Sequence, residues 1–356
     1  MVHNYSAGPC ILPQEVFKEA AEAVLDFNGL GLSILEISHR SPSFVAVMDE
    51  ARSLVRQALD VPDDYEVLFL QGGASLGFYI SAINYMKQGG KGAYIDTGSW
   101  SNKAIKEAKR LGEVDVIGSS ESANYNFIPK DFVVPNDADY LHFTSNNTIF
   151  GTQFKNLLKT EIPLICDMSS DIFSREINVS DYDLIYAGAQ KNLGPAGATL
   201  YIFKKDRIGH TGRDIPAMMD LGIHSKKDSM YNTPPVYSTY VSMLTLRWLL
   251  KNGGVSWISE INQNKADLLY NEIDRNPLFK GTAAKEDRSN MNACFVLNND
   301  EHKEAFDKLW NDANISGIKG HRSVGGYRAS IYNAMPIESL QVLVNTMQEL
   351  EKKYYN

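Results

Sequence analysis

Apolar residues recur at three- and four-residue steps within the first sixty residues of the chain. This spacing predicts two helices, over about 14–27 and 44–59, because it places the apolar side chains on one helical face. From Tyr65 onward, short apolar and β-branched runs alternate with helical patterns. The strands predicted in this way cover residues 65–70, 92–96, 138–145, 162–167, 182–189 and 198–203. Such alternation predicts an α/β fold whose mostly parallel sheet is covered on both faces.

The pattern changes twice in the second half of the chain. Residues 206–235 show little core-forming periodicity, and we expect irregular structure there. The last hundred residues predict helices over about 255–275, over 301–312 and after Pro336, and strands at 293–298 and 326–333. We therefore predict a large domain over 14–252 and a smaller C-terminal α+β domain over 253–356. Residues 1–13 are expected to pack near the functional site.

Length and charge narrow the class of protein. A chain of 356 residues exceeds what one core usually serves, which favours two domains. The formal net charge of −8, with both signs interspersed, provides no basic stripe, so we expect no nucleic-acid partner. No signal-peptide pattern or long apolar run is seen, which predicts a cytoplasmic protein without a membrane partner. Three scattered cysteines, Cys10, Cys166 and Cys294, fit reduced thiols and have no metal-ligand spacing, so we expect no metal.

A lysine and an aspartate stand at the ends of neighbouring predicted strands. Lys191 follows the strand of LIYAGAQK, and Asp167 ends the strand of PLICD. Ligands of open α/β sheets bind beyond the carboxyl ends of the strands, where both side chains would project. A strand-end aspartate is by itself more often a cap or a turn residue. The pair is therefore a candidate site only together with its neighbours.

Three further features lie at the same predicted edge. The turn QGGASLGF (71–78) passes from strand to helix, so the N–H groups of Gly73, Ala74 and Ser75 favour an anion there. Trp100, expected in a loop, offers a flat ring, and Thr148 offers a hydroxyl. The turn has neither the G-x-G-x-x-G spacing of a dinucleotide site nor the lysine-serine ending of a nucleotide-phosphate loop. The inference depends on the set, because each feature alone also has a structural explanation.

Together these groups match what pyridoxal phosphate requires. A lysine forms a Schiff base with the cofactor aldehyde, and a carboxylate keeps the pyridine nitrogen protonated. An aromatic face holds the ring, and a helix N-terminus holds the phosphate. The lysine must react as a free amine, so we expect burial and cationic neighbours to lower the pKa of Lys191.

Nine segments extend this match along the chain: NYSAGPCILP, EISHRS, LQGGASL, DTGSWS, SNNTIFGT, ICDMSSD, GAQKNLGPAG, YNTPP and GHRSVGGYRAS. In this order they resemble the phosphoserine aminotransferases, a family of fold-type I, class V pyridoxal-phosphate enzymes. The resemblance implies a seven-stranded sheet, a Schiff base on Lys191, Asp167 as pyridinium partner and Trp100 stacked on the ring. The further cofactor contacts that it implies come from Ala74, Ser75, Thr148, Ser169, Gln190, Asn232 and Thr233. In the family the last two come from the neighbouring subunit, so a homodimer with shared active sites is implied.

Two His-Arg pairs supply cations suited to carboxylate and phosphate groups. By resemblance, Arg328 would hold the substrate α-carboxylate, and the pocket for the distal anion would consist of His39, Arg40, His321 and Arg322. The implied reaction is reversible transfer of an amino group between L-glutamate and 3-phosphohydroxypyruvate. Its products are O-phospho-L-serine and 2-oxoglutarate, in L-serine biosynthesis. Formation of 4-phosphohydroxy-L-threonine in pyridoxine biosynthesis is a further reaction to test.

Four alternatives remain open from the residues alone. A cysteine desulfurase needs a mobile, exposed cysteine, whereas Cys166 and Cys294 lie in strand patterns. An alanine- or serine-glyoxylate aminotransferase would not require so many cations for a distal anion. A nicotinamide oxidoreductase would use a glycine turn on the same kind of sheet, although the fingerprint is missing. A non-catalytic binding protein would not need both the amine and its carboxylate partner.

Overall fold

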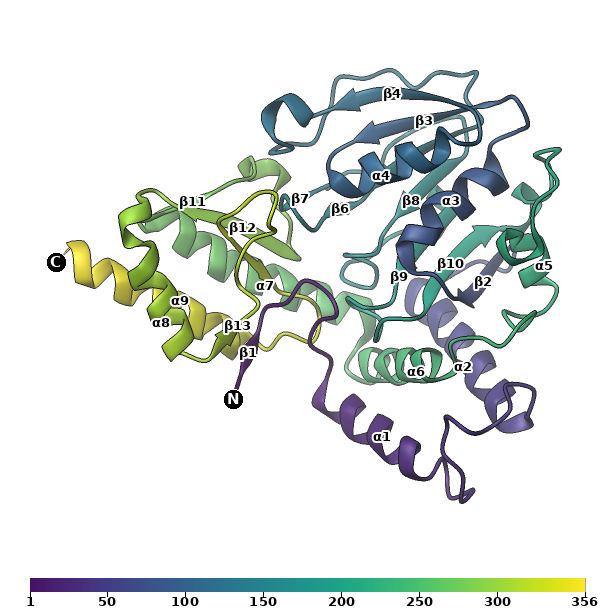
Figure 1. Cartoon of the computed structure of the whole chain (residues 1–356), viewed down its shortest axis with the longest axis horizontal. Coiled ribbons are helices and arrows are strands. Elements are labelled where there is room, and N and C mark those ends of the chain that lie inside the picture. The colour runs from purple at the N-terminus through teal and green to yellow at the C-terminus, as the bar shows by residue number, and fades with distance from the viewer. Residues whose placement is uncertain (356) are drawn as a thin grey trace.

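A seven-stranded sheet forms the centre of the protein (Figure 1), in a computed structural model that describes residues 1–355. Its strands, in spatial order, are β2 (Tyr65–Leu70), β10 (Thr199–Lys204), β9 (Leu184–Gly188), β8 (Leu164–Asp167), β5 (Tyr140–Thr144), β3 (Lys91–Asp96) and β4 (Glu113–Ser119). Only β10 runs antiparallel to its neighbours β2 and β9; all other pairs are parallel. The predicted α/β fold with a mostly parallel sheet is confirmed.

The edge strand β4 is the one strand of the seven-stranded sheet that the sequence pattern missed. Every residue of β4 is exposed or partly exposed, and Val116 is 44% exposed. β4 pairs only with β3 within the described chain. An edge strand of this kind lacks the continuous apolar run that marked the buried strands.

Helices cover both faces of the sheet because successive strand residues point to opposite sides. Val67 and Phe69 belong to the core shared with α1 (Gln14–Leu25), α2 (Pro42–Leu59) and α6 (Val236–Lys251). Leu68 and Leu70 belong to the core on the other face, with α3 (Gly73–Tyr85) and α4 (Ser99–Ala108).

Residues at the start of a helix fix where it begins. In α2, the Ser41 side chain accepts a hydrogen bond from the Phe44 N–H and Pro42 occupies the first position.

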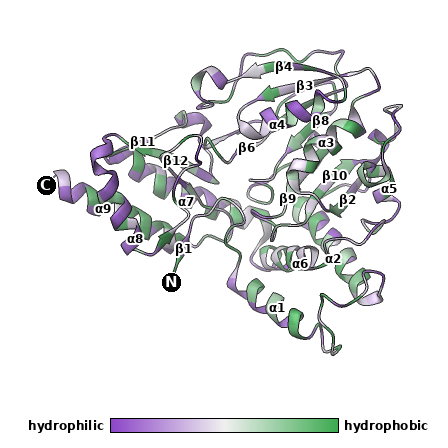
Figure 2. Ribbon diagram, in the orientation of Figure 1, coloured by the Kyte–Doolittle hydropathy of each residue, from purple (hydrophilic) through white to green (hydrophobic). Residues whose placement is uncertain are grey.

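A second region holds its own core, to the left in Figure 1. Its antiparallel sheet has the order β11 (Phe279–Gly281), β12 (Asn292–Leu297) and β14 (Tyr327–Ser330). It packs with α7 (Gly254–Arg275), α8 (Lys303–Asp312) and α9 (Ile337–Tyr355). Figure 2 shows α8 and α9 alternating between hydrophilic and hydrophobic colour, as expected of helices with one buried face.

Two contacts complicate the division at residue 253. The N-terminal strand β1 (His3–Asn4) pairs with β13 (Ile315–Ser316), and Tyr5 joins the core of the second region. Conversely, Val255 and Ile258 of α7 pack into the core of the large sheet. The domain bounds 14–252 and 253–356 therefore remain a proposal, and Asn356 lies outside the described residues.

The segment predicted to be irregular contains only short helical pieces. They are the 3₁₀ turns Lys205–Arg207 and Ala217–Met219 and the five-residue helix α5 (Leu221–Ser225). Among residues 1–355, no helix combines the length and the apolar composition needed to cross a membrane.

Candidate active site

A cavity of about 590 Å³ opens where the carboxyl ends of the parallel strands meet. Its walls also include the N-terminal segment and the second region, through Ala7, Gly8, His321 and Arg328. Ten of the predicted site residues line it: Ala74, Ser75, Trp100, Thr148, Asp167, Ser169, Gln190, Lys191, His321 and Arg328. The structure thus brings together the five features that the sequence placed at one edge.

Lys191 lies in the turn between β9 and β10, with only 9% of its surface exposed. Its Nζ donates a hydrogen bond to Thr148 Oγ1 at 2.7 Å. Burial lowers the pKa of Lys191 to about 8, further lowered by the charge of Arg328 and opposed by that of Asp167. A substantial fraction of the amine is therefore unprotonated near neutral to mildly basic pH, which is the state that reacts with a carbonyl.

The turn that carries Lys191 is held from the N-terminal segment. The Cys10 thiol donates to the Lys191 carbonyl at 2.7 Å. Gly8 has a φ of +145°, and a Cβ built there would lie 3.4 Å from the Gln190 carbonyl oxygen. Burial raises the pKa of Cys10 to about 12, so the thiol stays protonated and acts as a donor.

Asp167 ends β8 and points into the same cavity. Its Oδ1 accepts hydrogen bonds from the Ser169 hydroxyl at 2.6 Å and the Ser169 N–H at 2.9 Å. No residue among 1–355 donates to Oδ2. Burial raises the pKa of Asp167, while the Ser169 hydrogen bonds and the Lys191 charge lower it. A cationic ligand atom at Oδ2 would favour the ionised carboxylate.

The helix α3 begins at this cavity without a side-chain cap. Gly72 and Gly73 have positive φ values of 107° and 64°, which bend the chain from β2 into the helix. The first-turn N–H groups, including those of Ala74 and Ser75, consequently have no intrahelical partner. An uncapped helix N-terminus therefore borders the cavity at the glycine turn, as the predicted anion site requires.

Trp100 lies in the first turn of α4 rather than in a loop, which corrects the predicted position. Its ring borders the cavity, and its Nε1 is buried with no hydrogen-bond partner in the described chain. Lys103 Nζ lies 4.5 Å from the centroid of the ring. The side chain is thus held by a cation–π contact beside the ligand space.

Two predicted cations reach the cavity from the second region. Arg328 comes from β14, and its Nη1 donates to the Thr148 carbonyl at 3.4 Å, while its Nε is buried and unpartnered among residues 1–355. His321 Nδ1 lies 2.7 Å from Ser323 Oγ. Burial lowers the pKa of His321, as do Arg328, Arg322 and Lys103. This side of the cavity therefore presents the Arg328 guanidinium and an imidazole whose protonated form burial and the neighbouring cations disfavour.

Five predicted residues do not line the cavity of this chain: His39, Arg40, Asn232, Thr233 and Arg322. His39 is buried between α1 and α2, with no partner for Nε2 in the described chain, and Arg40 and Arg322 are exposed. The Thr233 carbonyl accepts a hydrogen bond from Gln71 Nε2 at 2.7 Å. The roles of these five residues remain proposals.

Other lining residues were missed by the sequence analysis. They include Ala7, Gly8, Thr144, Asn146, Ser170 and Gly197. Asn146 and Ser170 share a hydrogen bond of 2.8 Å beneath the cavity. Asn146 and Ser170 lie within two residues of the predicted Thr148 and Ser169, so inspecting their neighbours would have found them. Ala7 lies in the N-terminal segment that was expected near the site, although it was not named as a lining residue.

These groups fit pyridoxal phosphate. The free Asp167 Oδ2 suits a protonated ring nitrogen, the α3 N-terminus suits a phosphate, and the Lys191 amine suits an aldehyde. The orphaned Nε1 of Trp100 adds a donor beside the same space. The donor set and the charges of this cavity therefore agree with the predicted cofactor.

Comparison with known proteins gives a consistent result. The sequence profile of the family described as Aminotransferase class-V matches residues 2–343. The phosphoserine aminotransferase of Flavobacterium psychrophilum is 64% identical over 352 residues, which are 99% of either chain. A phosphoserine aminotransferase solved to study radiation damage of its Schiff base is 44% identical, with a TM-score of 0.96 and 99% of both chains covered. The structure of the enzyme from Trichomonas vaginalis with bound pyridoxal phosphate is 34% identical, with a TM-score of 0.93, covering 98% of this chain and 100% of that one.

The match extends over both regions and includes the N-terminal segment. The fold is that of the fold-type I enzymes, and the cofactor is pyridoxal phosphate. The chain belongs to the class-V aminotransferases, within the phosphoserine aminotransferase family.

Proposed function

We propose that the protein transfers the amino group of L-glutamate to 3-phosphohydroxypyruvate, giving O-phospho-L-serine and 2-oxoglutarate. The reaction is reversible and belongs to L-serine biosynthesis. The observation that carries this proposal is a buried Lys191 amine sharing one cavity with Asp167, the Arg328 guanidinium and the His321 imidazole. Relatives named phosphoserine aminotransferase, up to 64% identical over nearly the whole chain, support the same reaction.

Lys191 would act as the acid and base of the reaction. Bound pyridoxal phosphate supplies an aldehyde that takes up an amino group and a ring that accepts electrons. The Lys191 amine, with a pKa of about 8, is suited to take the proton from the substrate α-carbon and to return it. Thr148 Oγ1, 2.7 Å away, would orient the amine when it is free.

Asp167 and the α3 N-terminus would hold the two ends of the cofactor. Asp167 would stabilise a positive ring nitrogen, with Ser169 fixing the carboxylate through two hydrogen bonds to Oδ1. The N–H groups of Ala74 and Ser75 would bind the phosphate, and Gln190 borders the same space. Trp100 would stack on the ring face.

The cations would select the substrates. Arg328 would bind the α-carboxylate that all four substrates and products share. His39, Arg40, His321 and Arg322 would bind the distal group, which is a phosphate in one half-reaction and a carboxylate in the other. Because 4-phosphohydroxy-L-threonine carries the same phosphate and α-amino acid groups, its formation by this site is also proposed.

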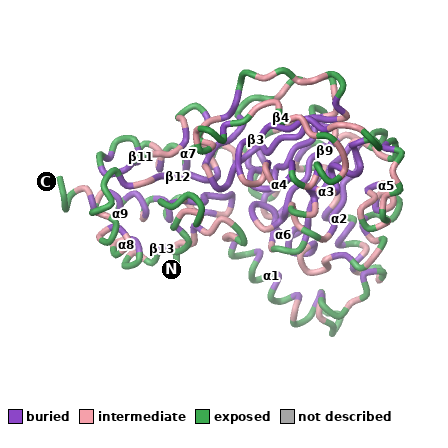
Figure 3. The backbone as a smooth tube through the Cα atoms, turned by 45° about the horizontal axis from the view of Figure 1, so that its top comes forward, coloured by how far each residue is buried: buried purple, intermediate pink, exposed green. Residues whose placement is uncertain are grey.

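A homodimer would complete the site. The loop between α1 and α2, which carries His39 and Arg40, exposes three leucines: Leu30 at 49%, Leu32 at 48% and Leu35 at 61%. Figure 3 shows how much of α1 and of the chain after it is exposed. A second copy covering these leucines would explain the exposed apolar surface. It would also supply Asn232 and Thr233 to the neighbouring cavity.

We propose a cytoplasmic location, in agreement with three free cysteines.

The test is a spectral titration of the purified protein loaded with pyridoxal phosphate. Adding O-phospho-L-serine or L-glutamate should convert the cofactor spectrum to that of its aminated form, and 2-oxoglutarate should reverse the change. L-Alanine should be a poor donor, which separates this function from that of an alanine-glyoxylate aminotransferase. A spectrum that responds to alanine and not to O-phospho-L-serine contradicts the proposal.

A further inference from the structure

A short hairpin carries the cavity residue that touches both Lys191 and Arg328. Its strands are β6 (Asn146–Asn147) and β7 (Thr152–Gln153). Thr148, in its turn, accepts from Lys191 Nζ through its hydroxyl and from Arg328 Nη1 through its carbonyl. The placement of this hairpin therefore bears on both the amine and the α-carboxylate site.

The far end of the hairpin is fixed by the side chain of Gln153, which is 1% exposed. Its Nε2 donates to Asp171 Oδ2 at 3.1 Å. Its Oε1 accepts from the Asn290 N–H at 3.1 Å and from Lys155 Nζ at 2.9 Å. One buried amide thus bonds to the turn after β8 with one end and to the chain entering β12 with the other.

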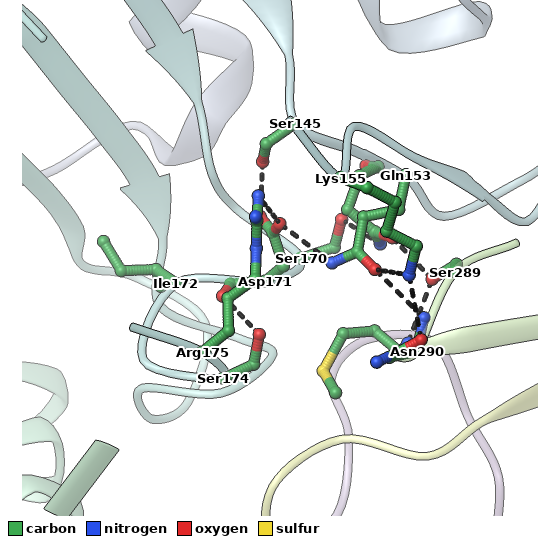
Figure 4. Close-up of polar contacts among 12 residues, drawn as sticks. Ser145, Gln153, Lys155, Ser170, Asp171, Ile172, Ser174, Arg175, Ser289 and Asn290 are labelled. Carbon is green, nitrogen blue, oxygen red and sulfur yellow. Dashed lines mark hydrogen bonds and ion pairs between the residues drawn. The ribbon is translucent and has the colours of Figure 1, made fainter. Parts of the chain in front are cut away.

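The carboxylate under Gln153 is itself firmly held. Asp171, whose side chain is 1% exposed, accepts hydrogen bonds from the Ser145 hydroxyl and from Arg175 Nη2, the latter at 3.4 Å. Ser145 Oγ also bonds to the Asp167 carbonyl at 3.1 Å. Figure 4 shows Asp171 and Arg175 below Ser145, and Lys155 beside Gln153. The donor end of Gln153 is therefore anchored to the segment that carries the proposed pyridinium partner.

The acceptor end reaches the strand next to that of Arg328. Asn290 lies two residues before the start of β12, and β12 pairs with β14 through Cys294 and Arg328. Lys155 Nζ reinforces the link by bonding to Asn290 Oδ1 at 2.9 Å, as Figure 4 shows. Displacing Asn290 from Gln153 would displace β12 and with it the Arg328 backbone, because paired strands move together.

We infer that Gln153 is a positioning residue, whose buried amide sets the distance between the Lys191 and Arg328 sites by joining Asp171 to Asn290. The inference rests on the proposed function, because it takes Arg328 as the α-carboxylate site. A loss of this link should act mainly on the α-carboxylate site, because Asp171 stays held by Ser145 and Arg175 whereas the Asn290 N–H loses its acceptor.

The test replaces Gln153 by methionine, which has a similar length and no hydrogen-bonding ends. We expect the KM values of L-glutamate and O-phospho-L-serine to rise together, by about threefold to tenfold, with kcat changed less than about twofold. A readout independent of turnover is hydrogen exchange in the cofactor-free protein. The peptide containing the Asn290 N–H should exchange faster in Gln153→Met, because that N–H loses its acceptor.

Two matched controls separate positioning from stability. Gln263→Met removes another glutamine that bonds to Asn290, at 2.8 Å, but from α7 on the same side of the junction. Asn84→Leu removes a buried amide of α3 that bonds to the Met219 carbonyl at 2.7 Å, far along the chain from the hairpin. Both should leave the two KM values within about twofold of the parent, even where Asn84→Leu lowers the melting temperature.

If Gln153→Met does not fold, Lys155→Met tests the same link, since the Lys155 side chain is exposed and its loss removes only the reinforcing bonds. A smaller rise in both KM values is then expected. Unchanged KM values, or a rise equal to that of Asn84→Leu, would overturn the inference. Failure of the proposed function looks different, since the parent protein itself would then not respond to glutamate or O-phospho-L-serine.

Discussion

The two halves of the cavity differ in how they are held. On the side of the large sheet, Lys191, Asp167 and Ser169 are buried and fixed by strand ends and short hydrogen bonds. On the substrate side, Arg40 and Arg322 are exposed on loops and do not reach the cavity of their own chain. Within one chain, Lys191, Asp167 and the start of α3 already share the cavity, whereas the predicted substrate residues Arg40 and Arg322 do not line it.

The largest expected effect comes from replacing Lys191, the amine of the buried half of the cavity. Lys191→Ala should keep the fold and lower turnover by about three orders of magnitude or more, because no other lysine among residues 1–355 lines the cavity. The visible absorbance of covalently held cofactor should disappear with it. Stopped assays and the absorbance spectrum measure both, and retained turnover would refute the role of Lys191.

Asp167→Asn should have the next largest effect. We expect kcat to fall by about a hundredfold to a thousandfold, since the ring nitrogen of the cofactor loses its charged partner. The melting temperature of the cofactor-free protein should not fall, because burial already disfavours the charged carboxylate. Kinetics and thermal unfolding of the two forms check this. A variant with kcat near that of the parent would show that Asp167 does not act on the ring.

Arg328→Ala should raise the KM values of all substrates by about tenfold to a hundredfold, through loss of charge-assisted hydrogen bonds.

Arg40→Ala should instead weaken binding of the distal group of the substrate, in the cavity of the neighbouring subunit. Mixing Arg40→Ala with Lys191→Ala under conditions that exchange subunits should therefore restore turnover above that of either variant. If the mixture stays at the level of its components, the substrate half is not shared between chains.

The smallest expected effect is on the pH dependence of stability, through a histidine in the sheet below the cofactor half of the cavity. His142 is buried in β5, with Nε2 2.8 Å from Tyr186 Oη, and burial lowers its pKa to about 3. The unfolded chain therefore binds a proton near pH 6.5 that the folded chain does not, so stability falls as pH drops from about 6.5 toward 3. His142→Gln should flatten this dependence by up to about 1.4 kcal/mol per pH unit. Unfolding by denaturant at several pH values measures it, and an unchanged slope would contradict the assignment.

The buried half was also the part that the sequence predicted best. Lys191 and Asp167 were found because each follows a continuous apolar strand, and strand ends of a parallel sheet meet at one edge. Strand β4 escaped because its residues are half exposed, and Trp100 was placed in a loop although α4 begins at Ser99. The link through Gln153 could not be predicted, since tertiary packing alone brings it to Asp171, 18 residues away, and to Asn290, 137 residues away.

The site of covalent attachment is the most direct test of the account. Treating the protein loaded with pyridoxal phosphate with borohydride makes the link permanent, and peptide mass spectrometry then locates the modified lysine. Lys265 is the sharpest internal competitor, because it is fully buried and burial lowers its pKa to about 7. Its Nζ, however, donates to three backbone carbonyls, of Ile331, Tyr332 and Met335, away from the cavity. Modification of Lys191 alone is predicted; modification of Lys265, or of neither, would contradict the central claim.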